Sequence, residues 1–132
     1  MYTETRKSYC SRMARYDRNV RFFENFLRIA LVDHERCEVR YVEGSRLVYL
    51  SLGSELELVQ RVYGEMLRLA ETNSIPLMDS SSFGMCTPHL HLLLHPVEGP
   101  AIRLSPGSIN HSTVEALGFV IVDAVIQALT GS

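Results

Sequence analysis

The segment 101–107, with the sequence AIRLSPG, narrows the possible folds of this chain more than any other. Its first four residues are apolar apart from one arginine, Arg103, and it ends at Pro106-Gly107, a pair that stops a strand. A helical pattern begins a few residues later. We therefore expect a strand over 101–104, a turn and then a helix. An arginine embedded in such a strand is suited to binding a carboxylate.

Length and composition limit the possibilities further. A chain of 132 residues, 46% of them hydrophobic, is long enough for one compact domain with a real core and too short for two ordinary domains. The formal net charge of −2 argues against a nucleic-acid surface, which normally carries a basic excess on one face.

The cysteines and the N-terminus indicate a cytoplasmic protein. Cys10, Cys37 and Cys86 are widely spaced and odd in number, which does not suit a disulfide framework and fits a reducing compartment. The first ten residues are polar and charged, unlike a signal peptide, and no run approaches the roughly eighteen apolar residues of a membrane span.

A long amphipathic helix is predicted from about Ser11 to Asp33. Its apolar residues recur at spacings of three and four, at Met13, Tyr16, Val20, Phe23, Leu27 and Ala30. The other face carries a basic row, Arg12, Arg15, Arg18 and Arg21. This row is either a solvated face or a surface that docks onto an acidic part of another domain.

A β-hairpin and a second helix are predicted next. Residues 37–41 and 46–52 have strand-like patterns, and Glu43-Gly44-Ser45 supplies the turn between them. A capping box formed by Ser54 and Glu57 then starts a helix that runs to Asn73.

The second half of the chain predicts three short strands and a last helix. Residues 75–78 form an edge strand or extended piece, 79–84 a loop of small residues, and 89–94 and 101–104 two strands. Ser112 and Glu115 form another capping box for a helix that ends near Leu129. The expected fold is an α/β two-layer small domain, with a mixed or antiparallel sheet covered by helices, in the order αββαβββα.

The last helix is apolar around most of its circumference, with only Glu115, Asp123 and Gln127 strongly polar between 114 and 129. Such a helix needs two partners. One is the sheet of its own domain, and the other is a second chain or a missing domain, unless the helix is fully buried at the centre of the domain. A homo-oligomer is one expectation from this pattern.

These elements together resemble the C-terminal small domain of fold type I pyridoxal-phosphate enzymes, with the Cys/Met metabolism branch of cystathionine synthases and lyases as the closest match. The resemblance rests on the order hairpin, helix, loop ending in Ser-Phe-Gly, strand, and then Ile102 to Gly107 before a terminal helix. It covers about 37–129, and the first helix matches the helix that leads into this domain. It divides the chain into a flexible segment 1–10, a leading helix 11–35 and the small domain 37–130.

The resemblance implies that Arg103 binds the α-carboxylate of an amino-acid substrate and that the loop at Ser82 lies beside it. It also implies a large domain with the pyridoxal-phosphate lysine, the aspartate that pairs the pyridine nitrogen and the phosphate-binding loop, none of which has a counterpart here. The only lysine, Lys7, precedes the first helix and cannot replace the family's lysine. The implied function is part of a transferase or lyase that is not catalytic alone.

The chain departs from the family pattern at two places. Met85 occupies the position of the usual second glycine of the loop, and Ile109-Asn110 replaces the acidic residue common after the strand's glycine. These differences affect what the resemblance implies about the chemistry of the loop.

A different hypothesis starts from Cys86, His89, His91 and His95. His89 and His91 are two apart on a strand and share a face, which a zinc ion can use, and Cys86 or His95 could complete the ligands. The alternative function is therefore an independent interaction or metal-binding domain. These histidines also suit solvent-facing or capping positions.

Overall fold

The computed structural model describes residues 5–41, 44, 46–79 and 87–130. Its elements are α1 (Arg6–Ala30), β1 (Glu38–Tyr41), β2 (Val48–Ser51), α2 (Leu56–Thr72), β3 (Met78–Asp79), β4 (His89–His95), β5 (Gly99–Ser105) and α3 (His111–Thr130). The predicted α/β class and the order αββαβββα are confirmed.

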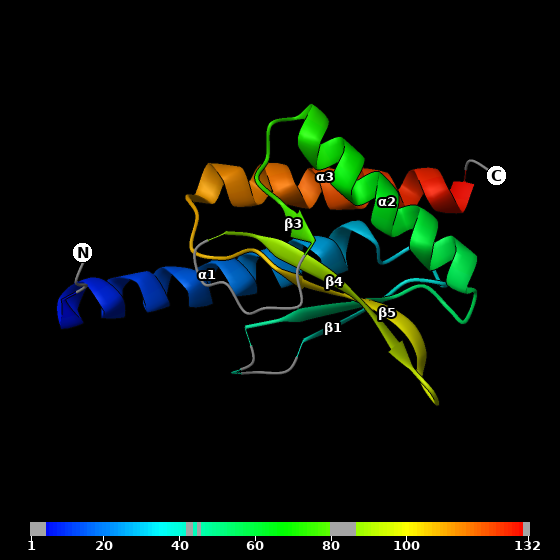
Figure 1. The fold of residues 1–132 in the computed structure, drawn as a ribbon, viewed down its shortest axis with the longest axis horizontal. Coiled ribbons are helices and arrows are strands. Elements are labelled where there is room, and N and C mark those ends of the chain that lie inside the picture. The colour runs from blue at the N-terminus through cyan, green and yellow to red at the C-terminus, as the bar shows by residue number, and fades with distance from the viewer. Residues whose placement is uncertain (1–4, 42–43, 45, 80–86, 131–132) are drawn as a thin grey trace.

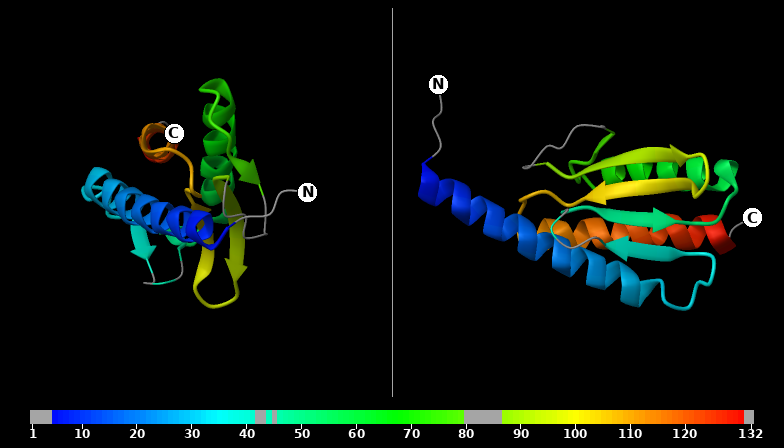
Figure 2. Two further views of the ribbon diagram at one scale, coloured as in Figure 1. Left: turned by 90° about the vertical axis from the view of Figure 1, so that its left-hand side faces the viewer. Right: turned by 90° about the horizontal axis from the view of Figure 1, so that it is seen from below.

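The strands form one mixed sheet in the order β1-β2-β5-β4-β3, in which only the pair β3 and β4 is parallel. The three helices lie on one side of this sheet, as the end-on view in Figure 2 shows, and α3 lies beside both α1 and α2 (Figure 1). Among the described residues no helix lies over the other face, which the right-hand view of Figure 2 presents to the reader. The domain therefore has two layers and one open sheet face.

The core fills the space between the helices and the sheet. Alternate residues of the central strands point into it and are almost fully buried: Val48, Leu50, Leu90, Ile102 and Leu104. Because successive strand residues point to opposite faces, the residues between them lie on the open face. Phe23 and Leu27 of α1 and Leu117 and Ile121 of α3 close the core from the helical side.

The helices begin at different residues from those predicted. Helix α1 starts at Arg6, five residues before the predicted Ser11, because the Thr5 side chain accepts a hydrogen bond from the Ser8 N–H. Both predicted capping boxes are wrong. Glu55 is the N-cap residue of α2 and makes no side-chain cap bond, whereas the Asn110 side chain caps α3 by accepting from the Thr113 N–H at 2.9 Å.

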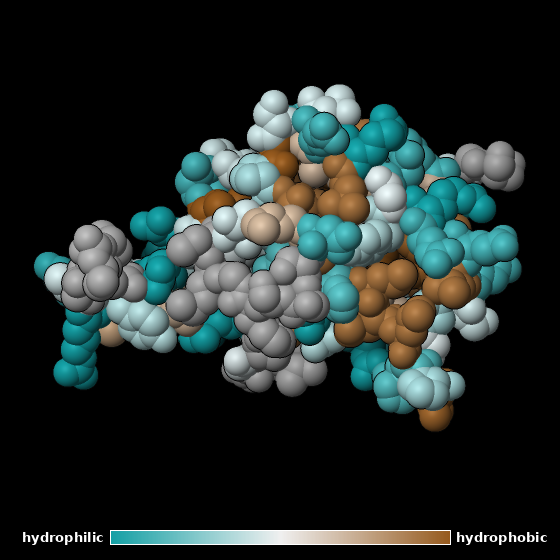
Figure 3. Space-filling model, viewed as in Figure 1, coloured by the Kyte–Doolittle hydropathy of each residue, from teal (hydrophilic) through white to brown (hydrophobic). Residues whose placement is uncertain are grey.

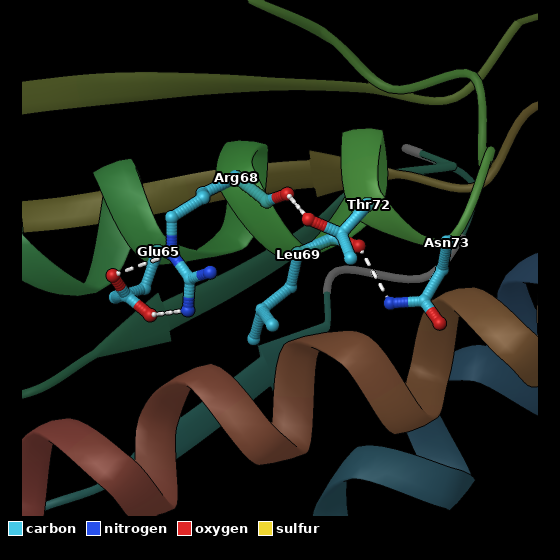
Figure 4. Close-up of polar contacts among 5 residues, drawn as sticks. All are labelled: Glu65, Arg68, Leu69, Thr72 and Asn73. Atoms are coloured by element: carbon cyan, nitrogen blue, oxygen red, sulfur yellow. Dashed lines mark hydrogen bonds and ion pairs between the residues drawn. The ribbon is translucent and has the colours of Figure 1, made fainter.

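Helix α2 carries its polar contacts on the outside (Figure 4). Arg68 donates two hydrogen bonds to Glu65, at 3.0 and 2.7 Å, and these bonds lower the pKa of Glu65. Near the C-terminal end, the Thr72 hydroxyl donates to the Arg68 carbonyl and the Asn73 side-chain amide donates to the Leu69 carbonyl, which also accepts the Asn73 backbone N–H at 3.0 Å.

Helix α3 is partly covered by two other helices. Gly118 allows the close approach of α1, since a Cβ at this position would stand 2.8 Å from the Phe26 ring. The Phe26 ring also packs edge-to-face on Phe119, with ring centroids 5.1 Å apart. Phe119 remains 56% exposed, so α3 is neither fully buried nor fully covered within this chain. By length and composition alone α3 could also cross a membrane, a test that core helices pass as well.

Candidate functional site

Arg103 lies on the open face of the sheet. It is on β5 between Ile102 and Leu104, which are buried on the helical side, so the alternation of the strand directs Arg103 to the opposite side. The residue is half-buried. The central position of β5 in the sheet places this guanidinium near the middle of the open face.

A row of four residues crosses the sheet at the level of Arg103. In the strand register Arg40 is opposite Tyr49, Tyr49 is opposite Arg103, and Arg103 is opposite His91. Directly opposite residues on one face have Cβ atoms about 4.5–5.5 Å apart. The open face therefore carries two guanidinium groups and an imidazole in one line, with a phenol ring between the two arginines. We call Arg40, Tyr49, Arg103 and His91 the cross-strand row.

A groove adjoins this row and has a volume of about 770 Å³. Arg40 and Tyr49 line it, together with Arg36, Ala101 and His95. Its charged lining is mixed, because Glu35, Glu38 and Glu98 lie there as well. The groove is large enough for a small organic molecule.

Apolar side chains border the groove at the far end of β4. Figure 3 shows them gathered over the second half of β4 and at the tip of the β4–β5 hairpin. Leu93 and Leu94 line the groove, and Leu94 is 65% and Val97 88% exposed. An apolar border of this kind is typical of a surface that meets another molecule or domain.

The other end of the open face is buried. His89 is opposite Ser105 in the register, and both are at most 2% exposed. The Tyr16 hydroxyl of α1 is hydrogen-bonded to the Ser105 hydroxyl. Neither ring nitrogen of His89 has a hydrogen-bond partner of standard geometry among the described residues.

The surroundings of His89 favour its neutral form. Burial is the main cause that lowers the pKa of His89, and the positive charge of Arg103 and the neighbouring His91 lower it further. The backbone at Thr87 acts in the opposite direction and is the second-largest influence after burial. His89 is therefore a buried neutral imidazole rather than a cation of the cross-strand row.

Helix α1 holds the turn that follows Arg103. The Asn19 side-chain amide donates to the carbonyl oxygens of Gly107 at 3.0 Å and Ile109 at 2.8 Å. In the predicted basic row of α1, Arg15 donates to the Ser108 carbonyl at 3.4 Å. The residues just after β5 are thus attached to a helix that is about ninety positions earlier in the chain.

The structure places the predicted residues at different locations. Arg103 lies in a strand, as predicted, and on the open face of the sheet, whereas Ser82 and Cys86 are outside the described residues. His91 belongs to the cross-strand row. The Nδ1 atom of His95, at the far end of β4, accepts from the N–H groups of Val97 and Glu98 at 3.1 and 2.9 Å, which is a turn-capping role.

The predicted metal ligands do not assemble in the part of the chain that the structure describes. Within those residues, no three His, Cys, Asp or Glu side chains form a group that could hold a metal ion. Cys10 and Cys37 are free thiols, and burial raises the pKa of Cys37 to about 11, which makes that thiol a poor ligand or nucleophile at neutral pH.

Sequence reasoning missed Tyr16, Asn19, Arg40 and Tyr49. The sequence pattern places Tyr16 in the apolar stripe of the first helix, and the polar Asn19 directly beside Val20 of that stripe is the available signal for a polar contact. Arg40 and Tyr49 join Arg103 only through strand pairing between distant segments. No local pattern contains that information.

Comparison with known proteins identifies no relative of this chain. No protein-family model, no curated protein and no solved structure matches the chain. The site therefore has to be interpreted from its own residues.

Proposed function

We propose that this chain is the C-terminal small domain of a pyridoxal-phosphate-dependent transferase or lyase, in which Arg103 binds the α-carboxylate of an amino-acid substrate. The observation that supports this proposal most is the position of Arg103 at the centre of a sheet face that no described helix covers. A planar, permanently charged guanidinium binds a carboxylate through two parallel hydrogen bonds. The open face offers both the room and the charge for that contact.

The neighbours of Arg103 agree with this role. Its opposite residues, Tyr49 and His91, are a hydrogen-bonding phenol and an imidazole, and neither brings a negative charge. Tyr16 and Asn19 of α1 hold the end of β5 and the turn after it. The Arg103 guanidinium therefore extends from β5, a strand whose end is held in place by α1.

The chain's own residues fit the substrate and not the cofactor. Lys7, the only lysine, is exposed near the start of α1. Pyridoxal phosphate supplies an electron sink for chemistry at the carbons of an amino acid, and it is held through a lysine. In this proposal a large domain outside this chain binds the cofactor and packs against the open face.

The first test is carboxylate binding by the chain itself. We expect butyrate, titrated into isotopically labelled protein at low ionic strength, to shift the amide signals of Tyr49, Arg103 and their neighbours. Arg103→Gln should weaken this binding about tenfold or more, and Arg103→Lys should restore part of it, because an ammonium keeps the charge but not the fork. Arg61→Gln, an exposed arginine of α2, is the matched control. Binding that is unchanged in Arg103→Gln would contradict the proposal.

The second test concerns the cofactor. We expect no stoichiometric internal aldimine when pyridoxal phosphate is added to the chain, because no lysine lies in the sheet or in the two later helices. Absorption spectra of the wild type and of Lys7→Ala measure this directly. A specific aldimine band that survives in Lys7→Ala would rule out the division of labour between two domains.

A further inference from the structure

We infer that the open face recognises a ligand with two anionic groups, one bound by Arg103 and the other by Arg40. This inference rests on the proposed function, because it uses the same Arg103. It makes the substrate an amino acid whose side chain also ends in a carboxylate. The observation behind it is the cross-strand row, which places a second arginine at a defined distance from the first.

The register sets the spacing of the two guanidinium groups. Arg40 and Arg103 are both opposite Tyr49, one on each neighbouring strand, and all three share the open face. Adjacent strands are about 4.8 Å apart, so the two arginine backbones lie about 10 Å apart. Two arginine side chains that start this far apart can bind the two ends of a short dicarboxylate whose middle passes over Tyr49.

The groove lies where such a ligand would extend. Arg40 and Tyr49 line it, and so does Arg36. Arg103 is next to it, since its opposite residue Tyr49 and its strand neighbour Ala101 are both in the lining. A ligand held at Arg103 therefore reaches Arg40 by extending into the groove.

The present contacts of Arg40 are weak enough to exchange. Its Nε atom is 3.7 Å from a carboxylate oxygen of Glu38, and both side chains are more than half exposed. Exposed ion pairs of this kind contribute about 0–1 kcal/mol. A ligand carboxylate can replace Glu38, which lies two residues before Arg40 on the same strand and competes for the guanidinium.

The experiment measures the binding of two straight-chain probes, the dicarboxylate glutarate and the monocarboxylate butyrate, to the whole protein at low ionic strength. We expect glutarate to bind about two- to fivefold more tightly than butyrate, because its second carboxylate gains one exposed ion pair with Arg40. Arg40→Gln should weaken glutarate binding more than butyrate binding, so that the two affinities become equal. Glu38→Gln should increase the gain, because it removes the competing carboxylate, and Arg61→Gln should change neither affinity.

The outcomes separate this inference from the proposed function. If butyrate binding depends on Arg103 while glutarate binds no more tightly than butyrate, the second anionic site is wrong and the carboxylate site stands. A glutarate preference that persists in Arg40→Gln also overturns the inference. If Arg103→Gln changes neither affinity, the proposed function fails together with the inference.

Discussion

The side-chain amide of Asn19 donates a hydrogen bond to the Gly107 carbonyl at 3.0 Å, and this contact fastens α1 to the turn that ends β5. The same amide donates to the Ile109 carbonyl at 2.8 Å. Asn19 is only 4% exposed, so water cannot replace either bond easily. Helix α1 thus fixes the strand end nearest Arg103.

We expect Asn19→Leu to lower the free energy of unfolding by about 2 kcal/mol, since it removes one buried and one partly buried hydrogen bond and leaves two carbonyl groups without this donor. Urea denaturation followed by circular dichroism measures this. Asn25→Leu, an exposed position on the same helix, should change the stability by less than about 0.5 kcal/mol. Equal effects at the two positions would show that the contact with the turn contributes nothing specific.

A methyl group added at Gly118 should weaken the packing of α1 on α3. Its Cβ would meet the Phe26 ring at 2.8 Å, and that ring is held between Phe22 and Phe119. Overpacking costs about 1–3 kcal/mol, and the better helix propensity of alanine offsets up to about 1 kcal/mol of this. Thermal unfolding should therefore show Gly118→Ala to be less stable than the wild type.

Gly64→Ala in α2 provides the control for the same substitution. No atom lies within 4 Å of the added Cβ there, so the change should stabilise the chain by about 0.5–1 kcal/mol. If Gly118→Ala were stabilising as well, the close approach of the two helices would not be a packing constraint.

Stability should decrease in mild acid because of His89. Its pKa in the folded chain is lowered below the ordinary value of 6.5, chiefly by burial, so the unfolded chain binds the proton first. The free energy of unfolding is therefore unaffected by this group above the unfolded pKa, and it falls as the pH drops through about 6.5 toward the lower folded value.

Denaturation curves between pH 5 and 8 test this, with His89→Leu and the exposed His111→Gln compared. The loss of stability in acid should be smaller in His89→Leu and unchanged in His111→Gln. A wild-type-like pH dependence in His89→Leu would assign the effect to other groups.

The exposed aromatic surface of α3 should promote self-association. Val122 and Ile126 on the same helix are half-buried, whereas Phe119 is 56% exposed and lies beside Phe26. We expect sedimentation velocity to show concentration-dependent association that Phe119→Ser reduces. Gln127→Ser, an exposed change on the same helix, should leave it unaltered. A chain that stays monomeric at all concentrations would contradict this prediction.

The local patterns predicted the elements well because each depends on neighbours in sequence. The spacing of Val20, Phe23 and Leu27 identified α1, and the apolar run around Arg103 that ends at Pro106 identified β5. The capping boxes failed because the residue that begins a helix depends on the preceding backbone. Asn110 rather than Ser112 caps α3 for this reason.

The sequence by itself determined the class of fold, the order of its elements and the placement of Arg103 in a strand, since hydrophobic periodicity is a local property. Only the tertiary structure decided that Arg40 and Tyr49 stand in line with Arg103 and that Asn19 holds the turn at Gly107. Strand pairing and helix docking join segments from about ten to ninety residues apart, and their register follows from packing the whole core at once.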